Sequence, residues 1–173
     1  MTEFELSVLD FIQNIRCGFL DTVMTTVSML GNKGILFIVL GIVLLFFKKT
    51  RKMGMTVLLS LAIMFLSCNI ILKNLFMRAR PFTHNGFELI IPKPSDYSFP
   101  SGHSAASFAA AVSVFMYNKK WGRFFIALAV MIAFSRLYLY VHFVSDVVAG
   151  IAIGILSALL ARAMLKPKFD KMK

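Results

Sequence analysis

The chain alternates long apolar runs with short polar segments, a pattern typical of helices that cross a membrane. A crossing helix needs about 20 mostly apolar residues. Five such runs occur, and they cover residues 34–47 (completed by 29–33), 54–72, 104–117, 124–141 and 143–165. The pattern therefore predicts a bundle of five transmembrane helices within residues 31–165.

The first thirty residues follow a different pattern. Apolar and polar side chains alternate with helical spacing over residues 4–15, and a second short helix is predicted over residues 19–30. An amphipathic helix of this kind lies on a membrane surface rather than across it. Residues 1–30 are therefore predicted to form interfacial amphipathic helices. The alternative is a sixth crossing made from residues 4–30, which would bury three charged side chains.

Composition excludes a water-soluble globule. Of the 173 residues 58% are apolar and only 16% are charged, whereas soluble domains carry about 45–50% and 25%. The chain is therefore predicted to be an all-α integral membrane protein with a single domain over residues 1–173. Its two cysteines, Cys17 and Cys68, offer neither a disulfide framework nor the spacing of metal ligands.

The net charge of +11, from 19 basic and 8 acidic residues, is a topology signal. Most of the basic residues fall in three segments that five crossings place on one face. They are Lys48, Lys49, Arg51 and Lys52; Lys119, Lys120 and Arg123; and Arg162, Lys166, Lys168, Lys171 and Lys173. This face, with the basic tail 166–173, is predicted to be cytoplasmic in a multi-pass cell-membrane protein. No nucleic-acid partner is expected.

Four ionisable residues lie in or beside the apolar runs toward the opposite face. Lys73, Arg80 and Arg136 are cations, and Asp146 is a carboxylate. Each such group costs about 2.5–3.5 kcal/mol at membrane depth. They must therefore face one another or a polar cavity, and an intramembrane ionisable residue is a functional hypothesis by default.

Spacing predicts that the two cations of the second run converge. Lys73 and Arg80 are seven residues apart, two helical turns, and are expected on one helix face. Pro81 is expected to end the helix at Arg80. Arg78 is expected to point elsewhere and to contact lipid headgroups.

Two further segments add groups suited to phosphate chemistry. Ser101, Gly102 and His103 begin an apolar helix, where free backbone N–H groups bind an anion. His142 and Asp146 are one turn apart, so the carboxylate can fix the imidazole tautomer and leave its other nitrogen as a nucleophile. Several cations and two histidines together indicate a multiply charged anion, of which phosphate is the obvious example.

These residues resemble the signature of the type 2 phosphatidic acid phosphatase superfamily, whose membrane branch dephosphorylates lipids. The signature has three parts: Lys, six residues and Arg-Pro; then Pro-Ser-Gly-His; then Ser-Arg, five residues, His, three residues and Asp. The matching residues are Lys73, Arg80 and Pro81; Pro100 to His103; and Ser135, Arg136, His142 and Asp146. No signature position departs from the pattern, and three parts in order are highly specific.

The resemblance implies a role for each residue. His142 attacks phosphorus to form a phosphohistidine, Asp146 orients it, and His103 protonates the leaving lipid oxygen and later activates water. The phosphate is held by Lys73, Arg80, Ser101, Gly102 and Arg136. No metal and no cofactor are expected.

The function expected from the resemblance is that of a lipid phosphatase acting on the extracytoplasmic face. Undecaprenyl diphosphate is the favoured substrate, with phosphatidylglycerophosphate or phosphatidic acid as alternatives. A small channel, transporter or scaffold is the non-enzyme alternative. Gly150 and Gly154 form a small-xxx-small pair, for which packing within a monomer is favoured over the seam of a weak dimer.

Overall fold

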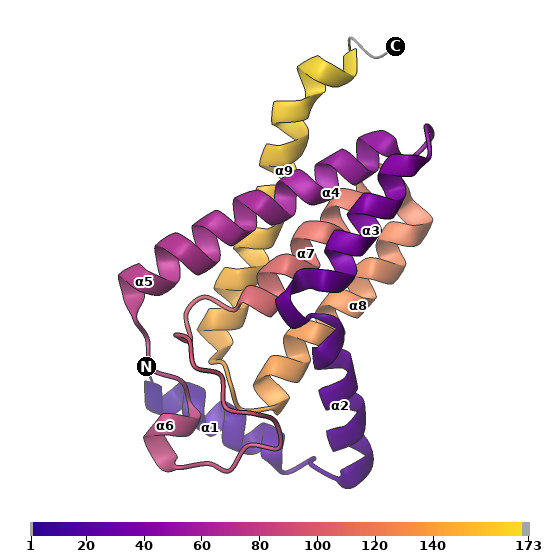
Figure 1. The fold of residues 1–173 in the computed structure, drawn as a ribbon. Helices are drawn as coiled ribbons and strands as arrows, with labels where there is room; N and C mark the ends of the chain where they lie inside the picture. Colours follow the sequence, from indigo (N-terminus) through magenta and orange to yellow (C-terminus); the bar gives the residue numbers. More distant parts are fainter. Residues whose placement is uncertain (1, 171–173) are drawn as a thin grey trace.

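The structure, a computed structural model, describes residues 2–170, and within that range every regular element is a helix (Figure 1). This confirms the all-α prediction. The elements are α1 (Thr2–Gln13), α2 (Gly18–Leu30), η1 (Asn32–Gly34), α3 (Ile35–Phe46), α4 (Arg51–Met64), η2 (Phe65–Leu72, π-helical), α5 (Lys73–Phe76), α6 (Phe82–Asn85), α7 (Gly102–Phe115), α8 (Lys119–Tyr138) and α9 (Val144–Asp170). The last residues of the predicted basic tail, 171–173, lie outside the described residues.

Four helical runs of the described chain are long and apolar enough to cross a membrane. They are Gly18–Phe46, Arg51–Phe76, Lys119–Tyr138 and Val144–Pro167. The fifth predicted crossing is α7, an apolar helix of 14 residues, which at 1.5 Å per residue is shorter than the hydrocarbon core of a bilayer. The structure is thus that of a helical membrane protein, and the number of crossings stays a prediction.

The first run differs from its predicted bounds. The structure continues α2 through η1 into α3, whereas the sequence pattern separates an interfacial helix before residue 31 from a crossing after it. Lys33 and Gly34 take left-handed backbone angles, with φ of 50° and 66°, and these bend the run without ending it. The interfacial position predicted for residues 19–30 is therefore not confirmed.

Helix α7 lies at the centre of the bundle and packs against α4, α8 and α9. Its residues are mostly Ala and Ser, and ten of them are buried. Because these side chains are small, the surrounding helices approach its backbone closely. Its first turn, which begins at Gly102, is consequently fixed from three sides.

The two glycines of the small-xxx-small pair form the contact between α9 and α7. A Cβ atom added at Gly150 would lie 2.5 Å from the backbone oxygen of Ser101, and one at Gly154 would lie 2.4 Å from that of Ala105. The pair is thus used for packing within the monomer, as the sequence favours.

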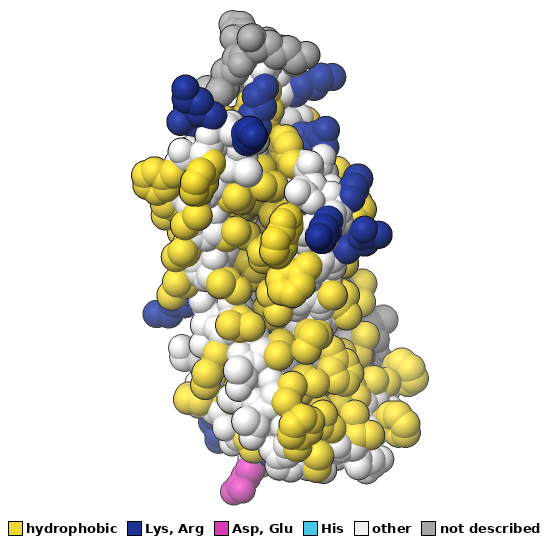
Figure 2. All heavy atoms as spheres, turned by 90° about the vertical axis from the view of Figure 1, so that its right-hand side faces the viewer, with side chains coloured by type: hydrophobic (Ala, Val, Ile, Leu, Met, Phe, Trp, Pro, Cys, Tyr) yellow, Lys and Arg dark blue, Asp and Glu magenta, His cyan; other side chains and the backbone are white. Residues whose placement is uncertain are grey.

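The surface divides into an apolar belt and a basic end. Figure 2 shows hydrophobic side chains over most of the visible face, with Lys and Arg gathered mainly at the end that carries the C-terminal part of α9. Contacts join the predicted basic segments there: Lys52 donates to the backbone oxygen of Phe169 at 3.1 Å, and Arg162 donates to that of Met116 at 3.3 Å.

The opposite end carries α1, α6 and the start of α2, with the irregular segment 86–101 between them and the bundle (Figure 1). Helix α1 lies across this end, and Glu5 and Leu9 are its buried residues. Phe4 and Phe11 on its other side are 73% and 72% exposed. A carboxylate on the buried side and two phenylalanines on the exposed side do not separate polar from apolar residues, so the amphipathic interfacial helix predicted here is not confirmed.

The α7–α9 contact predicts the effect of a single methyl group. We expect Gly154→Ala to lower the free energy of unfolding by about 1–3 kcal/mol, because its Cβ would collide with backbone that cannot move aside. Gly18→Ala is the matched control, since a Cβ there meets nothing within 4 Å. Thermal unfolding of the two variants in detergent would measure the difference, and equal stabilities would contradict the close approach.

Candidate active site

A cavity of about 950 Å³ lies between the α2–α3 bend, α4 with η2, and the first turn of α7. Residues from all three sequence motifs reach it, although they are up to 69 positions apart in the chain. Its polar lining consists of Thr25, Ser28, Asn32, Lys33, Asn69, Lys73, Arg80, Lys93, Ser95, Asp96, His103, Arg136 and His142. The structure therefore brings the predicted motifs to one place.

Two of the eight predicted site residues do not line this cavity. Ser101 and Asp146 lie behind its wall, and both are fully buried. Ser101 caps α7: its Oγ accepts a hydrogen bond from the Ser104 hydroxyl at 3.0 Å, and its backbone N–H donates to the backbone oxygen of Asp146 at 3.0 Å. Direct phosphate binding by the Ser101 side chain is therefore not supported by the geometry.

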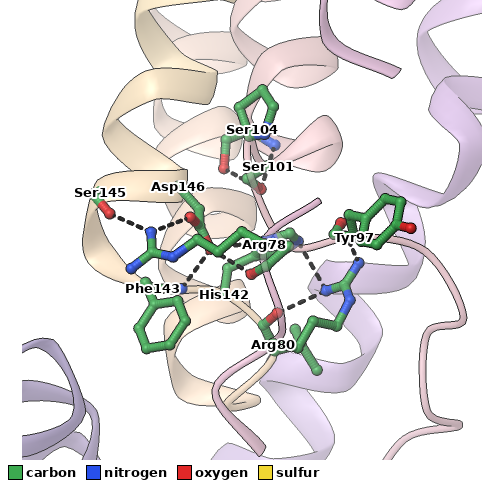
Figure 3. Close-up of polar contacts among 12 residues, drawn as sticks. Arg78, Arg80, Tyr97, Ser101, Ser104, His142, Phe143, Ser145 and Asp146 are labelled. Carbon is green, nitrogen blue, oxygen red and sulfur yellow. Dashed lines mark hydrogen bonds and ion pairs between the residues drawn. The ribbon is translucent and has the colours of Figure 1, made fainter. Parts of the chain in front are cut away.

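His142 lies in the short loop between α8 and α9, with its two ring nitrogens in different surroundings. Nδ1 is 3.6 Å from Oδ2 of Asp146, and Nε2 is 3.3 Å from Nη1 of Arg80 (Figure 3). A guanidinium can only donate, so Nε2 carries the lone pair and Nδ1 carries the hydrogen. Burial, reinforced by the charges of Arg80 and Arg136, holds the pKa of His142 well below its ordinary value. The ring is thus neutral, and its Nε2 lone pair accepts from Arg80 at the cavity wall. Nδ1 has no hydrogen-bond partner among the described residues, because Oδ2 of Asp146 is too distant to accept from it.

Asp146 accepts hydrogen bonds on both carboxylate oxygens. Oδ2 accepts from the Ser98 hydroxyl and, at 2.9 Å, from the backbone N–H of Phe143. Oδ1 accepts from Nη1 of Arg78 at 2.6 Å. These partners come from three separate segments, so the position of the carboxylate behind His142 is fixed by tertiary structure rather than by α9 alone.

The three predicted cations face the cavity from different elements. Lys73 begins α5, Arg80 follows it in the loop, and Arg136 lies in the last turn of α8. Each is at most 5% exposed. Nη1 of Arg136 donates to the hydroxyl of Ser28, while its Nε is buried with no partner in the described part of the chain. An arrangement of this kind binds an oxyanion.

Asp96, in the irregular segment before α7, pairs with two of these cations. Its carboxylate contacts Nζ of Lys73, and its Oδ1 is 2.6 Å from Nη2 of Arg80. Burial alone would raise the pKa of Asp96, but hydrogen bonds and charges from the two cations hold it at about 2. The group is therefore a carboxylate at all ordinary pH values and neutralises part of the cationic cluster.

His103 enters the cavity from the first turn of α7. Its Nε2 is 3.0 Å from Oδ1 of Asn32, in the bend between α2 and α3. Because an amide oxygen accepts, Nε2 is the protonated nitrogen. Gly102 lines the cavity beside it, and the N-terminus of α7 places backbone N–H groups there.

The structure corrects two expectations about the segment after Lys73. The helix ends at Phe76, because Met77 takes a left-handed conformation with φ of 44°, so Lys73 and Arg80 do not share a helix face. Their side chains converge through the loop instead, where both contact Asp96. Arg78 does not point away toward headgroups, since it donates to Asp146.

Sequence reasoning missed Arg78, Asp96, Ser98, Asn32 and Glu5. One signal was available for Arg78: it is a second arginine beside the Arg-Pro motif, in a chain that must neutralise a buried carboxylate. The others lie outside the signature, in loops or at the N-terminus, and nothing in their spacing indicates contact with the site.

Comparisons with known proteins agree with this geometry. The family model of the PAP2 superfamily matches residues 35–170. An undecaprenyl-diphosphatase of Sulfolobus acidocaldarius is 33% identical over 153 residues, which cover 87% of this chain and 73% of that protein.

Two solved structures share the fold along most of their length. The transmembrane PAP2-type phosphatidylglycerolphosphate phosphatase of Bacillus subtilis superposes with a TM-score of 0.76 and 29% identity, over 99% of this chain and 87% of that one. LpxE of Aquifex aeolicus superposes with a TM-score of 0.77 and 28% identity, over 90% and 93%.

The pairing of Asp96 predicts that this carboxylate competes with oxyanions for Lys73 and Arg80. We expect Asp96→Asn to tighten the binding of orthovanadate at least about threefold, because a negative charge leaves the anion site. Titration calorimetry on the detergent-solubilised protein measures this affinity. Glu88→Gln, an exposed carboxylate of the same segment, is the control. Weaker binding by Asp96→Asn would mean that Asp96 chiefly holds the cations in place.

Proposed function

This chain belongs to the PAP2 superfamily, and we propose that it is a membrane lipid phosphatase that forms a phosphohistidine intermediate without a metal. The observation that carries the proposal is the pair of environments around His142. A buried carboxylate lies behind its Nδ1, and three cations share the cavity that its Nε2 faces. A neutral imidazole so placed is a nucleophile aimed at an anion.

In the first step Nε2 of His142 attacks phosphorus. A nitrogen–phosphorus bond forms while the bond from phosphorus to the lipid-side oxygen breaks. His103 enters this step as the imidazolium, with a hydrogen on each ring nitrogen, gives one of these protons to the leaving oxygen and becomes neutral. Asp146 stabilises the hydrogen on Nδ1 as the ring becomes positive. Lys73, Arg80 and Arg136 stabilise the negative charge on the transferring group.

In the second step water attacks the phosphohistidine. His103, now deprotonated, takes a proton from the water, an oxygen–phosphorus bond forms, and the bond to Nε2 of His142 breaks. Inorganic phosphate leaves and both histidines return to their starting states. Each proton is carried by a residue of the chain, so the cycle is complete without a cofactor.

The apolar side of the cavity supports a lipid substrate. Beyond the charged groups its lining includes Ile38 of α3, Leu58, Leu61 and Ala62 of α4, and Phe65 of η2. Exposed hydrophobic residues such as Ile35 and Val39 of α3 continue this surface toward the bilayer. A phosphate at the cations would thus have its lipid chain beside α3 and α4.

Two further lysines favour a diphosphate over a monophosphate. Lys33 and Lys93 line the same cavity in addition to the three cations of the motifs. A second phosphate group adds negative charge that these lysines are able to balance. We therefore propose undecaprenyl diphosphate as the substrate, with phosphatidylglycerophosphate or phosphatidic acid as the alternatives.

The non-enzyme alternative is a channel, transporter or scaffold. An ion pathway requires polar or charged groups along a whole crossing. The charged residues that line the cavity are Lys33, Lys73, Arg80, Lys93, Asp96 and Arg136, all from the end of the molecule opposite the basic one. The distribution favours a site at one membrane face over a path through the membrane.

We expect the purified protein to release phosphate from undecaprenyl diphosphate in the presence of EDTA, and His142→Ala to abolish release. The physical reason is that the nucleophile is a side chain rather than a metal-bound water. Malachite-green assay of a lipid panel that includes the two alternatives measures both effects. His84→Ala is the control, since His84 does not line the cavity. Loss of activity on chelation, or full activity in His142→Ala, would contradict the mechanism.

We further propose that the basic end is cytoplasmic, that the site faces outside the cytoplasm, and that five crossings leave the N-terminus outside. The contacts of Glu5 with Arg78 and Ser145 support this topology, because they keep α1 at the site end.

The native cysteines provide the test of this topology. We expect a membrane-impermeant maleimide added to intact cells to label Cys17, which is exposed and precedes α2, while Cys68 is buried and unreactive. Mass spectrometry of the labelled peptides measures each site. Labelling of Cys17 only after the membrane is permeabilised would reverse the proposed orientation.

A further inference from the structure

Glu5, on the N-terminal helix α1, contacts the group that holds the catalytic carboxylate. The residue is 5% exposed, although the preceding Glu3 and Phe4 are exposed. Oε2 is 2.6 Å from Nη2 of Arg78, and Oε1 accepts the backbone N–H of Ser145 at 2.8 Å. A residue of the first helical turn is thus connected to the start of α9.

Arg78 forms the link between Glu5 and Asp146. One arm of its guanidinium, Nη1, donates to Oδ1 of Asp146 and to Oγ of Ser145, both at 2.6 Å, while the other arm, Nη2, donates to Glu5 (Figure 3 shows the first two contacts). The guanidinium of Arg78 lies over the ring of Phe143, and its Cζ atom is 3.9 Å from the centre of that ring. Because the guanidinium is planar and rigid, one orientation of it satisfies the carboxylates of Asp146 and Glu5 together.

The charges explain why two carboxylates are needed. Asp146 is completely buried and requires a cation, which Arg78 supplies. Arg78 itself is 25% exposed in its side chain, so without a second anchor it is able to turn toward water. Glu5 balances the guanidinium and fixes its direction. Burial would raise the pKa of Glu5, but hydrogen bonds from Ser145 and Arg78 lower it, so the group stays ionised.

We propose that Glu5 is a positioning residue of the active site, which acts through Arg78 to hold Asp146 behind His142. The N-terminal helix is then a working part of the catalytic centre rather than only an attachment to the membrane. This inference rests on the proposed phosphohistidine mechanism, because it concerns the carboxylate that orients the nucleophile.

A simpler role would be mechanical anchoring of α1. A second contact offers that role separately, since Asp10 of α1 accepts a hydrogen bond from the Tyr140 hydroxyl at 2.6 Å. Asp10 holds the helix to the loop that carries His142 without touching Arg78. The two carboxylates of one helix therefore allow anchoring and positioning to be distinguished.

The test compares Glu5→Gln with Asp10→Asn and with Glu3→Gln, whose side chain is exposed on the same turn. We expect Glu5→Gln to lower kcat about tenfold, the effect of losing one charge-assisted hydrogen bond. KM and inhibition by orthovanadate should change less than twofold, because the phosphate-binding cations are untouched. Glu3→Gln should match the wild type, and Asp10→Asn should keep most of kcat. Phosphate release and vanadate inhibition in detergent give all three parameters.

A double substitution provides a readout that a merely structural role would not give. Because Glu5 acts through Arg78, Glu5→Gln should lower kcat no further when added to Arg78→Gln. Glu5→Asp, which keeps the charge one methylene farther back, should have an intermediate kcat and covers the case in which Glu5→Gln fails to fold.

Three results would overturn the inference: wild-type kcat in Glu5→Gln, an equal loss in Asp10→Asn, or losses that multiply in the double variant. Each leaves the proposed function in place as long as the wild type hydrolyses a lipid phosphate. A wild type that hydrolyses none would remove both.

Discussion

The structure depends on the neutralisation of buried charge at one end of an apolar bundle. Lys73, Arg80 and Arg136 are almost fully buried, and Asp146 is completely so. In such surroundings an unpaired ion is strongly destabilising. The ion pairs near the site meet this requirement: Asp96 pairs with two cations, Arg78 pairs with Asp146, and Glu5 pairs with Arg78. Among the residues that the structure describes, Nε of Arg136 has no partner, and a bound anion would supply one.

Much of the site could be predicted from the sequence, because ionisable residues at membrane depth must face one another or a polar cavity. Five apolar runs and four ionisable residues at membrane depth predicted that Lys73, Arg80, Arg136 and Asp146 meet at one level. The helix N-terminus and the motif spacing added His103 and His142. The fold class followed from the same pattern. These predictions succeed because the free-energy cost of burying a charged side chain is large and depends little on the exact local structure.

What could not be predicted depends on backbone details that single positions decide. A left-handed Met77 ends the helix before Arg80, and left-handed Lys33 and Gly34 bend α2 into α3 instead of separating them. Gly34 is suited to that conformation, but neither lysine nor methionine favours it, so no local signal was present at Lys33 or Met77. The partners Asp96, Asn32 and Glu5 come from loops or from the far N-terminus, where spacing carries no information about tertiary contact.

The acidic residues show the same need to neutralise buried charge, since most of them are partners of groups near the site. The chain has only eight, and five of them bond to other groups at the site end: Glu5, Asp10, Asp21, Asp96 and Asp146. Lys and Arg concentrated at one end are a topology signal that needs no partner in the protein. The carboxylates at the site end do have partners. Asp10 joins α1 to Tyr140 of the loop that carries His142, and Asp21 joins α2 to Tyr138 at the end of α8. Asp96 joins the 86–101 segment to Lys73 and Arg80. Most of the few acidic residues of this apolar chain therefore form contacts that fix the segments around the nucleophile His142.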